Sequence, residues 1–89
     1  MNKIPLEIRL SIYSKIDEYI EKIDKLIERQ YNGLITFENC VDDCNNVVKD
    51  YKVFLNTNYN LIGDELEEFT GDLRIVMLDK LTELYHKEY

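Results

Sequence analysis

The sequence has little of what loops, turns and enzyme sites need. Its 89 residues include three glycines, one proline, one histidine and two cysteines, and they include no tryptophan and no alanine. The scarcity of glycine and proline excludes a loop-rich or disordered chain. The longest apolar run, Ile75-Val76-Met77-Leu78, is far too short to span a bilayer. Since 45% of the residues are hydrophobic, we expect one modest core and a single domain over residues 1–89.

Basic residues are also scarce, and this limits the partners that the chain can have. Lysine and arginine number 11 against 18 aspartates and glutamates, which gives a net charge of -7. Direct binding of nucleic acid or of an anionic membrane is therefore unexpected, because phosphate groups are held by basic surfaces. Residues 1–5 show no apolar segment of the kind found in export signals, so the sequence predicts a cytoplasmic protein.

Apolar residues recur every three or four positions in the first two thirds of the chain, which is typical of amphipathic helices. The first such stretch predicts a helix over residues Leu6–Tyr31, ended by Asn32-Gly33. Thr36 is a good N-cap for a second helix, whose apolar stripe runs from Phe37 to Leu55. Charged residues fill the opposite faces of both helices, so each is expected to pack on one side only.

Residues 56–63 change in character and contain three asparagines, which favours a connecting loop. Asp64 is the expected cap of a third helix with an apolar stripe from Leu66 to Tyr85. Thr70-Gly71-Asp72 is a potential break within it, because glycine weakens a helix and threonine caps one. Short links between long helices give antiparallel neighbours. The sequence therefore predicts an all-α, antiparallel up-down bundle of three helices, or of four if the break occurs.

The side chains that catalyse reactions or bind metals are few and badly placed. His86, the only histidine, lies near the end of the last helix, where the helix dipole favours a positively charged side chain. Cys40 and Cys44 are four residues apart on the apolar stripe, so we expect two reduced core thiols and no disulfide. A zinc site needs four ligands, and these two sulfurs have no second pair. We expect no catalytic residue, no metal site, no cofactor and no enzymatic activity.

Acidic residues are concentrated in the last third of the chain, where residues 61–89 carry eight acids and three bases. The dense part, called the acidic segment below, consists of Asp64, Glu65, Glu67, Glu68 and Asp72. Acids at a helix N-terminus are favoured by the helix dipole, and this is one explanation of the segment. The other is an outward surface that binds a basic protein. Tyr59, like Tyr31 and Tyr89, is a candidate contact residue, whereas Tyr13, Tyr19 and Tyr51 are expected in the core.

The link between the first two helices carries a resemblance to a known family. This link runs from Leu26 to Thr36 and includes Gly33-Leu34-Ile35-Thr36. Together with the helix that follows, it resembles a junction in small bacterial immunity proteins of the colicin D and contact-dependent inhibition type. In those proteins a helix is followed by Gly-x-Ile-Ser/Thr and then by a second helix. Those proteins also end in an acid-rich helix. The resemblance implies a helical bundle that binds a cognate toxin, often an RNase or DNase, and blocks its basic active site.

These observations predict a non-enzymatic inhibitor of the immunity or antitoxin type, which covers the active cleft of a basic, nucleic-acid-acting protein. Asp64, Glu65, Glu67, Glu68 and Asp72 would make the electrostatic contact, with Tyr59 as an anchor. One alternative is a phage or mobile-element inhibitor of a host defence nuclease, similar in effect to an anti-CRISPR protein. Another is a structural bundle that forms a homodimer through the wide apolar stripe of the first helix, which includes Tyr13, Ile20 and Ile27.

Overall fold

The computed structural model describes residues 4–88 and folds them into three helices. These are α1 (Leu6–Tyr31), α2 (Phe37–Tyr59) and α3 (Gly63–Glu88). Residues 4–88 contain no strand, so the prediction of an all-helical bundle is confirmed. None of the helices in this part of the chain has the length and apolarity needed to cross a bilayer.

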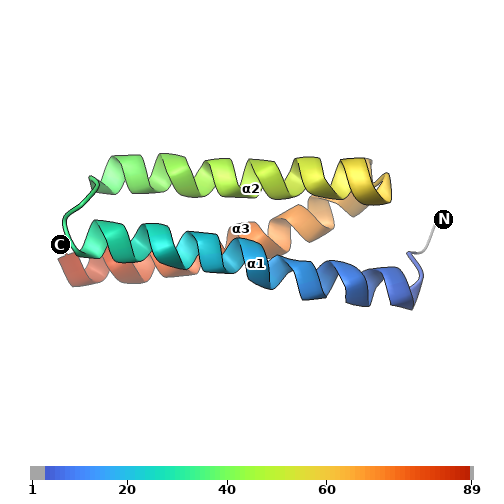
Figure 1. Ribbon diagram of the computed structural model, residues 1–89, viewed down its shortest axis with the longest axis horizontal. Helices are drawn as coiled ribbons and strands as arrows, with labels where there is room; N and C mark the ends of the chain where they lie inside the picture. Colours follow the sequence, from blue (N-terminus) through green and yellow to red (C-terminus); the bar gives the residue numbers. More distant parts are fainter. Residues whose placement is uncertain (1–3, 89) are drawn as a thin grey trace.

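Each helix packs against both of the others, and the chain reverses its direction at each link (Figure 1). The molecule measures 45 × 20 × 19 Å. Its long axis thus follows the helices, since 26 residues at 1.5 Å rise give roughly 39 Å. The core therefore runs along the bundle as a narrow column, and every helix keeps one face outside.

The first link forms as the sequence predicts. Gly33 adopts a left-handed conformation with φ of 76°, and the amide of Leu34 donates a hydrogen bond of 2.8 Å to the carbonyl of Arg29. Such bonds satisfy carbonyl groups at the end of α1. The Thr36 hydroxyl accepts a hydrogen bond of 3.1 Å from the amide of Asn39. Thr36 is thus confirmed as the N-cap of α2.

The second link is shorter than predicted, because residues 56–59 belong to α2 and only residues 60–62 connect the helices. Asn56 donates a side-chain hydrogen bond of 3.0 Å to the carbonyl of Leu61, and Asn58 donates one of 3.0 Å to that of Phe54. Asn60 then ends the helix in the left-handed conformation, with φ of 55°. The asparagines therefore satisfy one carbonyl group in the last turns of α2 and one in the link that follows. The predicted loop over residues 56–63 was wrong for its first half.

Helix α3 begins at Gly63, so Asp64 lies in its first turn and is not its cap. The helix also continues through the potential break at residues 70–72. Thr70 is completely buried, and its hydroxyl donates a hydrogen bond of 2.7 Å to the carbonyl of Leu66, one turn earlier. With its hydroxyl used inside α3, Thr70 caps no new helix, and the bundle has three helices between residues 4 and 88.

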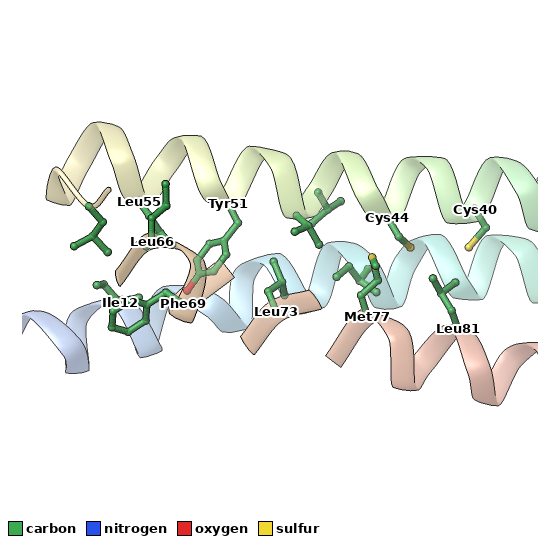
Figure 2. Packing of buried hydrophobic residues seen from close by; sticks show 14 of the residues in the cluster. Ile12, Cys40, Cys44, Tyr51, Leu55, Leu66, Phe69, Leu73, Met77 and Leu81 are labelled. Carbon is green, nitrogen blue, oxygen red and sulfur yellow. The ribbon is translucent and has the colours of Figure 1, made fainter. Parts of the chain in front are cut away.

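The core is formed by the inner faces of all three helices, as Figure 2 shows for part of it. Tyr51, Phe69 and Leu73 are completely buried at its centre. Cys40 and Cys44 are also buried and are free thiols, as expected. Burial raises the pKa of Cys40 and raises that of Cys44 to about 12. Both sulfurs are therefore neutral thiols at pH 7.

Candidate protein-binding surface

The acidic segment covers the outward side of the first half of α3. Leu66, Phe69 and Leu73, which alternate with the acids along the chain, are buried in the core. This spacing of three and four residues turns the carboxylates away from the core. Three of the acids are exposed and two are half-buried: Asp64, Glu67 and Glu68 are exposed, and Glu65 and Asp72 are intermediate. The structure therefore brings the five predicted residues together on one helix surface.

Two of the five carboxylates are paired with cations of the same chain. Glu67 accepts a hydrogen bond of 2.8 Å from the ammonium group of Lys52 on α2, and this bond lowers the pKa of Glu67. Glu68 lies 3.5 Å from the guanidinium of Arg9 on α1. Arg9 also lies over the ring of Phe69, at 5.3 Å from its centre. A cation thus borders the acidic segment on each side and reduces its net charge.

The other three carboxylates, those of Asp64, Glu65 and Asp72, form no salt bridge with any residue between 4 and 88. Desolvation raises the pKa of Asp72, the charge of Glu68 raises it further, and Arg9 opposes both effects. Asp72 therefore carries its charge less favourably than an ordinary surface aspartate. A cation supplied from outside would meet its strongest attraction at these three residues.

Tyr59 does not lie in a loop but in the last turn of α2. Its hydroxyl shares a hydrogen bond of 2.7 Å with that of Ser11 on α1, and its ring packs edge-on against Phe54 at 5.8 Å. Tyr59 is half-buried. These contacts hold the start of α1 and the end of α2 together. They also occupy the side chain that was expected to anchor a partner. Tyr31 is 62% exposed, and Tyr89 lies outside the described residues.

The remaining candidate residues lie apart from the acidic segment. The thiol of Cys40 donates to the carbonyl of Leu26 at 3.6 Å, inside the core. His86 is exposed near the end of α3 and lies beside the ring of Tyr85. Residues 4–88 hold no group of three or more side chains that could bind a metal ion. None of these residues extends the acidic segment.

The start of α1 carries an exposed apolar stripe, of which the sequence analysis named only Tyr13 when it considered a homodimer. Leu6, Leu10 and Tyr13 are 69%, 58% and 42% exposed, although Tyr13 was expected in the core. Tyr13 still packs its ring against Phe69, with the ring centres 5.7 Å apart. The spacing of four and three residues from Leu6 to Leu10 and Tyr13 is the sequence pattern that could have predicted this stripe. Leu6 and Leu10 were not singled out, because α1 has apolar residues on more than one side and their spacing alone does not show which of them face the core.

A shallow groove lies between the second half of α1 and the end of α3. It has a volume of about 300 Å³, with Ile27, Tyr31 and Leu84 among the residues that line it. Asp24 and Lys80 form a salt bridge of 2.7 Å across it. Lys87 and Glu83, also in its lining, form a second salt bridge of 3.4 Å, so both lysines of the groove are paired within the chain.

No protein-family model matches the chain, and searches among curated proteins and among solved structures found no match either. The resemblance to immunity proteins of the colicin D type therefore stays a prediction.

Proposed function

We propose that the chain is a non-enzymatic binding protein that neutralises a basic, nucleic-acid-acting protein by covering its active cleft. In this proposal it is an immunity protein or antitoxin of the cytoplasm, and it binds through the first half of α3. The observation that carries the proposal is the set of three carboxylates, those of Asp64, Glu65 and Asp72, that form no salt bridge with the described residues, although the charge of Arg9 acts on Asp72.

The physics of such a contact is that of a rigid surface that imitates a polyanion. A protein that cleaves or holds nucleic acid presents a basic cleft, and a net charge of -7 attracts that cleft over a distance of several ångströms. The reversal of chain direction at each link (Figure 1) supports an antiparallel, up-down bundle as the platform. The backbone of a packed helix is ordered before binding, so only the side chains of the carboxylates lose conformational freedom when a partner binds.

The five acids of the segment are not equal in this proposal. A partner's cation gains little from Glu67 or Glu68, since Lys52 and Arg9 already lie beside them. An exposed salt bridge with the partner contributes only about 0.2–1 kcal/mol, and a carboxylate that already forms a salt bridge within the chain gains less than that. Asp64, Glu65 and Asp72 therefore carry most of the attraction, and Glu67 and Glu68 mainly fix the position of α3 against its neighbours.

The experiment that tests the proposal begins with affinity capture from the native host, followed by an assay of the captured protein on DNA and RNA. The triple variant Asp64→Asn, Glu65→Gln, Asp72→Asn should inhibit it more weakly, by roughly three- to a hundredfold at 0.15 M salt if each contact contributes 0.2–1 kcal/mol. A matched control removes three exposed charges from α2, at Asp42, Asp43 and Asp50. The control should inhibit like the wild type.

Two results would contradict the proposal. The captured protein could have no activity on nucleic acid and no basic cleft, or the triple variant could inhibit as well as the wild type. An inhibitor encoded by a phage or mobile element would act by the same physics on a host defence nuclease. Gene neighbourhood and the identity of the inhibited nuclease distinguish that alternative.

A further inference from the structure

The exposed apolar stripe of α1 lies at the edge of the acidic surface. Leu6, Leu10 and Tyr13 follow one another at intervals of four and three residues, so they lie along one side of the first two turns of α1. All three are more than 40% exposed, although two are leucines. Three large apolar side chains in a row, kept in contact with water, mark a surface at which another molecule is expected.

Contacts between α1 and α3 join this stripe to the acids. The ring of Tyr13 packs on Phe69, and Arg9, which is three residues after Leu6 and four before Tyr13, reaches Glu68 at 3.5 Å. The side-chain charges of Arg9 and Glu68 also act on Asp72. The stripe and the carboxylates therefore form one surface across the two helices. We call it the apolar-acidic surface, made of Leu6, Leu10, Tyr13, Glu68 and Asp72.

The charge of this surface limits what it binds. A second copy of the chain, related by a two-fold axis, would bring Glu68 and Asp72 close to their own counterparts, and like charges oppose such an interface. An anionic lipid surface is disfavoured for the same reason. The surface is complementary instead to a segment with apolar side chains along one line and basic side chains beside it. An amphipathic, cationic helix has that arrangement.

We propose that the apolar-acidic surface docks a cationic amphipathic helix of the partner protein. The apolar side chains of that helix lie on Leu6, Leu10 and Tyr13, and its lysines or arginines lie against Asp72, because Glu68 is already paired with Arg9. This inference rests on the proposed function, since the helix belongs to the basic protein that the chain neutralises. It adds an apolar anchor to the electrostatic contact, in place of Tyr59, whose side chain is occupied within the chain.

Two features of the surface fit this occupant. The stripe spans eight residues of α1, and the seven steps between them rise roughly 10 Å at 1.5 Å per step. This length matches the two turns that a docked helix offers through positions i, i+3, i+4 and i+7. Asp72 is half-buried and lies near the charge of Glu68, which disfavours its carboxylate form. A cation from the docked helix would offset that unfavourable charge.

The test uses a synthetic 18-residue helical peptide of leucine and lysine, with its leucines on one face. A second peptide has the same composition in an order that spreads the leucines around the helix, and a third has glutamate in place of lysine. Each is titrated into the ¹⁵N-labelled chain. We expect the first peptide to bind at least tenfold more tightly than the others and to shift the amide signals of Leu10, Tyr13 and Asp72.

Leu10→Ser tests the apolar anchor and should weaken binding of the first peptide about fivefold or more. Val53→Ser is its control, because Val53 has the same 58% exposure but lies on α2. It should leave the affinity unchanged. Circular dichroism and melting temperature establish that the variants are folded, and Leu6→Ser replaces Leu10→Ser if the latter is not.

Three results would overturn the inference: equal affinity for the two leucine-lysine peptides, equal effects of Leu10→Ser and Val53→Ser, or signal shifts confined to α2. A dimer of the free chain that Leu10→Ser dissociates would make a second copy the occupant, and would overturn it too. Failure of the proposed function is distinguishable. If the Leu10→Ser variant inhibits the captured nuclease normally while the triple acid variant inhibits it more weakly, only the docking of a helix on this surface is refuted. If the peptide results hold and no nuclease is inhibited, only the proposed function is refuted.

Discussion

Tyr51 provides the sharpest test of the packing in the core. It is completely buried, and its hydroxyl has no hydrogen-bond partner among residues 4–88. Figure 2 shows the side chain reaching from α2 toward Phe69. Burial raises the pKa of the phenol, and the charge of Asp72 raises it further. Tyr51→Phe removes the hydroxyl but keeps the ring, which packs against that of Tyr19 at 4.9 Å.

The expected effect follows from two opposing terms. A buried polar group without a partner costs about 1–3 kcal/mol, and the substitution removes that cost. The one-atom space that remains costs roughly a few tenths of a kcal/mol at about 24 cal/mol per Å³. Tyr51→Phe should therefore stabilise the fold by about 1–2 kcal/mol. For a domain of this size that is a rise of roughly 4–16 °C in Tm, at about 4–8 °C per kcal/mol.

Thermal and urea unfolding at pH 7, followed by far-ultraviolet circular dichroism, measure this effect directly. Tyr31→Phe is the matched control, because Tyr31 is 62% exposed and its hydroxyl is not buried. It should change Tm by less than a degree or two. A loss of about 1 kcal/mol or more in Tyr51→Phe would refute the reasoning, since it would mean that the hydroxyl is hydrogen-bonded in the folded protein.

Three further predictions concern single residues. Gly71→Ala should stabilise the fold by about 0.5–1 kcal/mol in urea titrations, because Gly71 is helical and an added Cβ meets no atom within 4 Å; a destabilised variant would contradict this. Because the bond from Lys52 lowers the pKa of Glu67 below 4.5, Glu67 should stabilise the fold above that pH and lose this contribution as the pH falls through its folded pKa. Glu67→Gln should accordingly lower the urea midpoint more at pH 7 than at pH 3, and an equal effect at both would refute it. Cys44, with a pKa of about 12, should react with iodoacetamide only as fast as the protein unfolds, measured by mass spectrometry; reaction at the rate of a free thiol would contradict the packing.

Much of the fold could be predicted because its signals are local. The apolar spacing predicted α1 with both of its ends, and Thr36 predicted the start of α2. The errors arose where tertiary contacts override weak local preferences. The asparagines after Leu55 favour turns, yet Tyr59 packs against Phe54 and keeps the chain helical to that residue. Gly71 weakens a helix, but Phe69 and Leu73 on either side of it are completely buried and hold α3 together.

The candidate surface could be predicted only in part. The cluster of acids is visible in the sequence, but the cations beside it are not, since Lys52 and Arg9 lie 15 and 59 positions away from the carboxylates that they pair with. Which of the five acids remain without a partner is therefore a property of the packing of three helices. The same packing decides that Tyr13 is exposed and that Tyr59 is occupied.

The rate of association with the captured partner, measured against ionic strength, tests the central claim most directly. Stopped-flow measurements from 0.02 to 0.5 M salt should show a steep fall in the rate constant for the wild type and for the α2 control variant. The variant without the charges of Asp64, Glu65 and Asp72 should associate more slowly at low salt, with a much flatter dependence. Identical salt dependence of this variant and the wild type would contradict the claim that these carboxylates attract the partner.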